Sequence, residues 1–206
     1  MSDDALAPLV AESYTALADV LDGLAVSGWD TPSLCEGWRV REVVAHLTMP
    51  ARYDEESFMA ELEADGFDFT KLSNRIASRD AALSTDELVA NLRSEVLQRW
   101  TPPGGGYHGA LNHVVIHGLD VTVPLGAPRT ASDDALRVVL DDLTAGGGHE
   151  HFGVAIEGRT LRATDLDWSH GSGPEVSGAA EDLALAACGR TLPPGRLHGE
   201  PLARGE

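Results

Sequence analysis

The chain has 206 residues, with 33 acidic and 15 basic side chains, a formal net charge of −18 and a hydrophobic fraction of 43%. Its length suits one domain, or one domain with a small appendage, and its composition excludes a disordered or fibrous chain. Lys71 is the only lysine. Phosphate backbones and anionic lipids repel such an acidic chain, so nucleic acid is not an expected partner.

Two features predict a cytoplasmic protein. No apolar run in the sequence reaches the roughly 20 residues that span a bilayer, and the first residues, MSDDALAPLV, are acidic where a secretory signal is basic. We therefore expect no membrane association. Cys35 and Cys188 lie far apart in the sequence, and we expect both to stay reduced in that compartment.

The N-terminal half has the periodicity of helices. Apolar residues recur at helical spacing over residues 4–26 and predict a first helix. The loop DTPSLCEGW leads to a second helix in WRVREVVAHL. Pro50 follows this segment, and the residue four positions before it is His46. Because proline cannot donate a hydrogen bond and clashes with that carbonyl, we expect the helix to be interrupted next to His46.

The helices that follow have recognisable ends. Residues 68–82 fit either a helix or an ordered crossover. Ser84 and Glu87 form the reciprocal cap of a helix N-terminus. The next helix is expected over residues 109–123, and Ser132 caps a shorter helix that three glycines end.

The pattern changes after Gly148. The segments GVAIEG, RTLRATD and PEVSG are strand candidates, and AAEDLALAACGR is a final helix. We predict a mainly α protein in three parts: a helical bundle at residues 1–148, a small α/β domain at 149–192 and a flexible tail at 193–206, which is rich in proline and glycine.

His113 and His117 are the first candidates for a functional site. Residues four apart on a helix share a face, and Asp120 falls on the same face. The surrounding residues are apolar nearly all round, so this helix should be buried. Two buried imidazoles need a shared partner, which is either a metal ion or, for core histidines, a set of backbone carbonyls or Asp120.

A metal ion requires a third ligand, and His46 on the second helix is the natural candidate; the alternative is a boundary histidine that contacts solvent. Three neutral imidazoles would leave a cation with its full charge and one open position, which is the arrangement of catalytic zinc. Zinc is the expected metal, with nickel as an alternative.

The segment TPSLCEGWRVREVVAHL, followed about seventy residues later by HVVIHGLDV, resembles the mycothiol-dependent maleylpyruvate isomerase family of the DinB-like superfamily. LRATDLDWSHGSGPEVSGAAEDLALAACGR resembles the small C-terminal α/β domain of the same proteins. The resemblance implies a DinB-like four-helix bundle with a C-terminal α/β appendage. It also implies a metal site at one end of the bundle, formed by His46, His113 and His117.

One position departs from the family pattern. In the maleylpyruvate isomerases the middle metal ligand resembles a glutamate, whereas the residue at this position here is His113. The ligand set is therefore more similar to the three-histidine form of other DinB-like thiol transferases. The resemblance implies mycothiol as the thiol cosubstrate, its sulfur bound to the metal as a thiolate. The expected function is a metal-dependent mycothiol S-transferase or isomerase that acts on a small electrophile.

Residues other than the three histidines also have expected roles. Asp120 is a candidate for orienting one imidazole, with a plain polar residue near a helix end as the alternative. Arg190 is a candidate for binding a substrate carboxylate, although a helix C-terminus also explains it. Cys35 and Trp38 belong to the CEGW segment, which we expect to pack at the end of the bundle near the site. We interpret Cys35 as structural, because no base lies near it in the sequence.

Two other functions stay open. One is a non-catalytic bundle that binds a metal or a ligand, and the other is a metal-dependent hydrolase that uses metal-bound water. The expected partners are a small-molecule thiol and an electrophile, with the protein a monomer or a homodimer.

Overall fold

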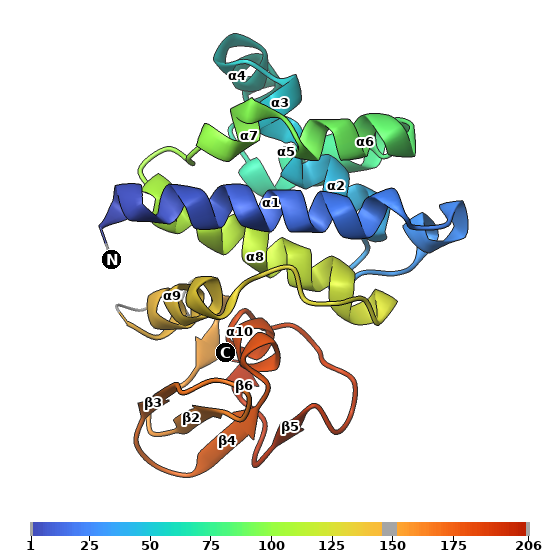
Figure 1. The fold of residues 1–206 in the computed structure, drawn as a ribbon. Helices are drawn as coiled ribbons and strands as arrows, with labels where there is room; N and C mark the ends of the chain where they lie inside the picture. The colour runs from blue at the N-terminus through green and yellow to red at the C-terminus, as the bar shows by residue number, and fades with distance from the viewer. Residues whose placement is uncertain (1, 146–151, 205–206) are drawn as a thin grey trace. The chain divides into compact units, whose positions relative to one another are not determined.

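The protein is described here as a computed structural model, which covers residues 2–145 and 152–204 (Figure 1). The chain divides into two compact units, Met1–Thr130 and Ala131–Glu206. The first unit is helical and the second combines helices with short strands.

The first unit begins with a short 3₁₀ helix, η1 (Asp3–Leu6), and contains a second, η2 (Val26–Asp30). Its α-helices are α1 (Ala7–Asp22), α2 (Val40–Leu47), α3 (Met49–Arg52), α4 (Glu55–Ala64), α5 (Phe69–Asp80), α6 (Thr85–Leu92), α7 (Glu95–Arg99) and α8 (Gly106–Leu125).

The core of the first unit forms where the apolar faces of these helices meet. Helix α1 packs against α6, α7 and α8, while α2 packs against α5, α6 and α8. Leu17 of α1, Val43 of α2 and Leu111 of α8 are fully buried. Burying aliphatic side chains of this size stabilises the fold by about 1.5 to 3 kcal/mol each, so this interior fixes the relation between α2 and α8.

Helix α8 receives its N-terminal cap from a distant residue. Asp3 of η1 accepts hydrogen bonds from the backbone amides of Tyr107 (2.8 Å) and His108 (3.2 Å). Gly106 has a left-handed φ of 56°, and a Cβ there would lie 2.8 Å from the Asp3 carboxylate. The start of α8 is therefore tied to the start of the chain, and the carboxylate also complements the positive end of the helix dipole.

The predicted interruption beside His46 is confirmed. Helix α2 ends at Leu47, Thr48 forms the cap, and α3 begins at Met49 with Pro50 in its first turn. Pro50 cannot donate to the carbonyl of His46, and its fixed φ suits the start of a new helix. The chain therefore turns immediately after the histidine.

The second unit contains α9 (Asp133–Thr144), β1 (Val154–Ala155), β2 (Thr160–Ala163), β3 (Ser169–Gly171), β4 (Glu175–Gly178), α10 (Ala180–Ala187), β5 (Leu197–His198) and β6 (Ala203–Arg204). Its four-stranded sheet has the order β3-β2-β4-β5. Strands β2 and β4 are parallel, and the other neighbouring pairs are antiparallel. Strands β1 and β6 form a separate antiparallel pair, and α10 packs against α9 and β2.

This division differs from the predicted domains. We expected α9 in the bundle, but α9 belongs to the second unit because it packs on α10. The predicted boundary between residues 148 and 149 lies outside the described residues. Within the predicted tail, residues 197–198 pair with β4 and residues 203–204 pair with β1.

Among the described residues, no helix is both long enough and apolar enough to cross a bilayer.

Candidate metal centre

His46 reaches the site from the last turn of α2. Val40, Val43, Val44 and Leu47 bury the apolar side of this helix, and the backbone amide of Arg39 donates to the Glu42 carboxylate at 2.8 Å to close its first turn. His46 itself is buried, with 7% of its surface exposed. Because α2 ends at Leu47, this imidazole lies at the end of the helix.

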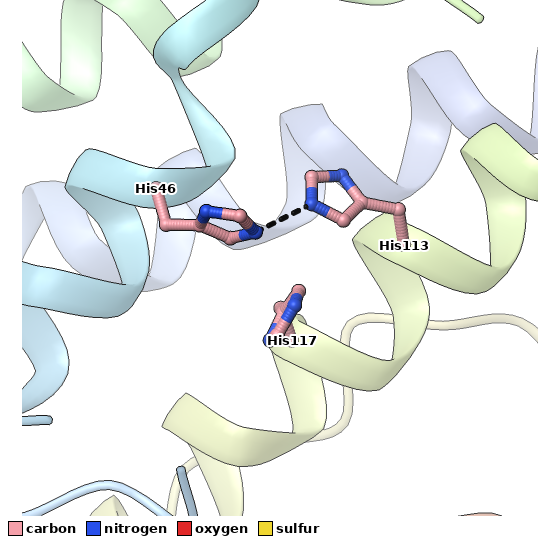
Figure 2. A group of neighbouring side chains, drawn as sticks. All are labelled: His46, His113 and His117. Carbon is pink, nitrogen blue, oxygen red and sulfur yellow. Dashed lines mark hydrogen bonds between the residues drawn. The ribbon is translucent and has the colours of Figure 1, made fainter. Parts of the chain in front are cut away.

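His113 and His117 reach the site from α8, one turn apart. Apolar residues bury the helix around them, including Leu111, Val114, Val115 and Leu119. The two imidazoles are half-buried, and they project toward the same point as His46 (Figure 2). The residues that the sequence predicted as ligands therefore meet, although 67 residues separate His46 from His113.

The geometry of the three imidazoles matches a shared cation. The ring centroids lie 5.0 Å apart for His46 and His113, 5.0 Å for His46 and His117, and 5.1 Å for His113 and His117, with planes crossing at 73°, 78° and 88°. Nitrogens about 2 Å from a tetrahedral cation would place the centroids about 5 Å apart. One potential ligand atom from each histidine lies within 4.8 Å of the others.

Burial favours the neutral form of two of these imidazoles, His46 and His113. It lowers the pKa of His46 to about 3, and the neighbouring His117 lowers it further. Burial also lowers the pKa of His113 well below its ordinary value. Neutral imidazoles have a free lone pair for a cation. The His46 and His113 Nε2 atoms are 3.0 Å apart, close enough for one ion to bridge.

The opposite nitrogens of the three rings have different surroundings. The Nδ1 atoms of His46 and His113 are buried and have no hydrogen-bond partner among the described residues. His117 Nδ1 lies 3.0 Å from Asp120 Oδ2, and Asp120 is fully buried. When Nδ1 donates to this carboxylate, the lone pair of His117 is on Nε2. Asp120 therefore lies within hydrogen-bond distance of His117, and its orienting role stays a prediction.

Cys35 lies on this side of His117, and the sequence does not predict the contacts that it makes there. Its Sγ lies 2.9 Å from Asp120 Oδ2 and 3.6 Å from His117 Nδ1. The two contacts join residues 85 and 82 positions apart, so local sequence patterns could not reveal them. Cys35 therefore contacts Asp120 and His117 beside the three histidines.

Pro124 explains how the Cys35 loop is attached to α8. A proline inside a helix leaves the carbonyl four residues earlier without its usual donor, and for Pro124 that carbonyl belongs to Asp120. The backbone amide of Leu34 donates to it at 3.1 Å. The same residue therefore contacts the loop through its carbonyl and Cys35 through its carboxylate.

The loop has its own internal structure. Ser33 Oγ donates to the carbonyl of Trp38 at 2.8 Å and accepts from the amide of Cys35 at 3.1 Å, while Gly37 adopts a left-handed φ of 80°. Trp38 Nε1 donates to Asn74 Oδ1 of α5 at 2.9 Å. These bonds hold Cys35 and Trp38 in place at the end of the bundle.

Two tryptophans lie beside the histidines. The Trp38 ring is 5.2 Å from the His46 ring, and the Trp100 ring is 5.5 Å from the His113 ring, measured between centroids. The segment CEGW had suggested Trp38 as a packing residue near the site, but no sequence signal indicated Trp100. These indoles shield two of the imidazoles from water.

Arg190, the predicted carboxylate-binding residue, lies in the second unit. It follows α10, its amide donates to the carbonyl of Leu185 at 3.0 Å, and it lines a cavity of about 350 Å³ formed by residues of that unit. A substrate-binding role for Arg190 stays a prediction.

The fold and the site define a class of protein: a helical bundle with a candidate three-histidine metal centre, attached to a small mixed-sheet unit. Residues 10–105 match the family of the mycothiol maleylpyruvate isomerase N-terminal domain. This match lies within the helical unit, and over these residues the chain is similar to this family.

Solved structures agree with this similarity at the level of the fold. A crystal structure of the mycothiol-dependent maleylpyruvate isomerase aligns with a TM-score of 0.60 and 17% identity over 97% of this chain and 93% of that chain. A histidine-to-alanine variant of that isomerase aligns with a TM-score of 0.57 and 17% identity over 93% of this chain and 90% of that chain. No curated protein matches the sequence.

Proposed function

We propose that the protein is a divalent-metal enzyme that adds mycothiol to a small electrophile, either to transfer the thiol or to isomerise the substrate. The observation that carries this proposal is the meeting of His46, His113 and His117 around one point, with ring centroids about 5 Å apart in every pair. Similarity to this family supports mycothiol as the thiol.

The residues around the site suit this chemistry. A divalent cation, zinc or alternatively nickel, would supply positive charge that favours the anionic form of a coordinated thiol. His46, His113 and His117 would hold it through neutral nitrogens, and Asp120 would fix the orientation of His117. Trp38 and Trp100 would limit the access of water and so limit hydrolysis as a side reaction.

His113, at the position where the resembling isomerases have a glutamate, changes the charge of the proposed centre. A neutral imidazole in place of a carboxylate leaves one more unit of positive charge at the centre, which stabilises a bound thiolate and lowers its nucleophilicity. Arg190 is the proposed partner for a substrate carboxylate. The partners are small molecules, and nucleic acid is not among them, because the chain carries a net charge of −18.

The test uses protein purified without an affinity tag, stripped of metal and reloaded with zinc. The zinc protein is incubated with mycothiol and monochlorobimane, and separately with mycothiol and maleylpyruvate. We expect conjugation or isomerisation above the metal-free background. His117→Ala should remove bound zinc and activity together, while His108→Ala, a change at a histidine of the same helix that is outside the site, should retain both.

Each contrary result points to a different function. Zinc binding without either thiol reaction contradicts the proposal, and hydrolysis of an activated ester by the same protein would then support the hydrolase. Equal metal content in wild type and His117→Ala would contradict the site itself. If the folded protein binds no divalent metal, the non-catalytic bundle is the alternative that remains.

A further inference from the structure

His117 lies between two sets of possible metal ligands. Its ring faces His46 and His113 on one side, and its Nδ1 faces Cys35 and Asp120 on the other. Cys35 Sγ, His117 Nδ1 and an Asp120 carboxylate oxygen lie within 4.8 Å of one another. The second group has a different donor chemistry, one sulfur, one nitrogen and one oxygen.

The distances in this second group are those of a site that needs little movement to bind a cation. A tetrahedral zinc ion with Zn–S of about 2.3 Å and Zn–N of about 2 Å separates these two atoms by about 3.5 Å, and the observed Sγ to Nδ1 distance is 3.6 Å. The two distances to Asp120 Oδ2, 2.9 and 3.0 Å, are those of hydrogen bonds. A shift of the carboxylate by roughly half an ångström would make room for a cation.

The protein holds these three ligands in place without a metal. Leu34 is bonded to the Asp120 carbonyl, Ser33 is bonded to the Cys35 amide, and Asp120 and His117 lie one turn apart on α8. Asp120 is fully buried, whereas Cys35 is half-buried. The loop therefore presents its thiol to a fixed helix, with one partly accessible side from which an ion can enter.

Charge and softness favour this group for thiophilic cations. A thiolate and a carboxylate together neutralise a divalent ion, whereas three imidazoles leave its charge uncompensated in a largely buried place, which is costly. Thiolate sulfur also selects soft metals over hard ones. Cadmium, a soft divalent ion, should therefore prefer the sulfur-containing group.

We propose that Cys35, His117 and Asp120 form a second, thiophilic metal site that competes with the three-histidine site for His117. Binding forms a metal–sulfur bond, releases the thiol proton to solvent and moves the His117 proton from Nδ1 to Nε2. The protonated Nε2 can then no longer serve the three-histidine site. One neutral imidazole cannot bind cations on both sides, so the two sites exclude each other.

The proposal has a consequence for the protein in the presence of soft metals. A thiophilic cation would disable the three-histidine site without occupying it, because it holds His117 in the wrong tautomer and orientation. This inference needs only the geometry of the ligands and does not depend on the proposed thiol chemistry.

The test is a titration of the tag-free, metal-free full chain with cadmium chloride. The measurements are the ultraviolet thiolate-to-cadmium charge-transfer band and the bound cadmium per chain. We expect the band in the wild type, with one ion per chain at saturation. Cys35→Ser should abolish the band while zinc uptake by the histidines changes less than about twofold, because Asp120 still contacts His117.

The other variants separate the two sites. His46→Ala removes a ligand of the three-histidine site alone, so the band should persist. His117→Ala should weaken cadmium binding by more than about tenfold, because it removes a ligand of both. Cys188→Ser is the matched control for cysteine loss, since that thiol lies in the second unit. Circular dichroism of each variant verifies folding, and Cys35→Ala serves if the serine variant is unfolded.

Four results would overturn the proposal. These are no charge-transfer band in the wild type at saturating cadmium, a band that survives Cys35→Ser, a band lost in folded His46→Ala, or two cadmium ions per wild-type chain. The first three reject Cys35 as a ligand of the proposed site, and the last rejects the competition for His117. A failure of the mycothiol assay would leave all four readouts unchanged.

Discussion

His117 is the residue on which the chemistry of the site converges. Its neighbours His46 and His113 have Nδ1 atoms without a partner among the described residues, so only His117 has a carboxylate that selects its tautomer. Asp120 is buried on the same helix, three residues further along. The affinity of the three-histidine site for a metal should therefore respond more strongly to Asp120 than to other acidic residues.

Asp120→Asn should weaken zinc binding by about tenfold to a hundredfold, because the amide accepts a weaker hydrogen bond from His117 than the carboxylate does. Competition with a chromophoric chelator measures the zinc affinity. Asp134→Asn, at an exposed carboxylate of α9, is the control and should bind zinc like the wild type. Wild-type affinity in Asp120→Asn would show that the carboxylate does not position His117.

At this scale the sequence predicted which histidines would meet, but not the side chains that surround them. The spacing of His113, His117 and Asp120 is a local property of one helix, and His46 was a candidate from its place on a second predicted helix, which the family pattern supported. The contacts of Cys35 and the position of Trp100 became visible only in the structure, because these contacts join residues that no local sequence pattern relates. Side-chain contacts between a loop and a helix leave no periodic signal.

At the scale of helices, the two prolines near the site behave differently. Pro50 ends α2 and starts α3, but Pro124 lies inside α8, which continues to Leu125 and ends at Gly126 with a left-handed φ of 60°. The sequence placed the end of this helix close to Pro124. The helix extends past it because Leu34 donates to the carbonyl that Pro124 leaves unpaired, a tertiary contact that propensity does not include.

Helix capping gives the next prediction. Asp3→Ala should lower the free energy of unfolding by about 1 kcal/mol, because two amides at the start of α8 lose their acceptor. Asp3→Asn should retain most of the stability, since the amide oxygen can still accept. Urea unfolding measures the change. Asp4→Ala is the neighbouring control, and equal losses in both alanine variants would rule out a specific cap.

At the scale of the molecule, the predicted order of helices followed by short strands is correct, and the domain boundary is less clear from sequence. Strands β5 and β6 contain two residues each, too few to show an alternating pattern. They form because β4 and β1 offer unpaired edges. Residues that looked like a loose tail therefore contribute to the second unit.

The second unit contains a buried carboxyl group whose pKa should make the free energy of unfolding depend on pH. Burial raises the pKa of Asp182 to about 6, although Arg196 opposes the shift, and the unfolded chain has a pKa near about 4. Between these values the folded state binds more protons, so the free energy of unfolding falls as pH rises from about 4 to 6. Asp182→Asn should remove this contribution.

Thermal unfolding at pH 4.5 and pH 7 checks this expectation. The thermal midpoint at pH 7 minus the thermal midpoint at pH 4.5 gives the effect of pH on each protein. This difference should be more positive for Asp182→Asn than for the wild type. Asp167→Asn, at an exposed position in the same unit, should leave the difference unchanged. An identical difference in all three proteins would mean that Asp182 does not titrate in this range.

The overall charge predicts a response to salt. With 33 acidic and 15 basic residues, repulsion between like charges should exceed the attraction of the exposed ion pairs. Raising sodium chloride from about 0.01 to 0.15 M shortens the screening length from about 30 to 8 Å and should raise the thermal midpoint. Potassium chloride should act equally, and a lowered midpoint would show that ion pairs dominate.

The bond between Asp3 and α8 also affects how the protein should be handled. The carboxylate that caps the histidine-bearing helix lies two residues after the first methionine, so a purification tag or reporter fused to that end would crowd the cap. A polyhistidine tag there would also compete for the very ions under study. Labels are best cleaved before metal measurements.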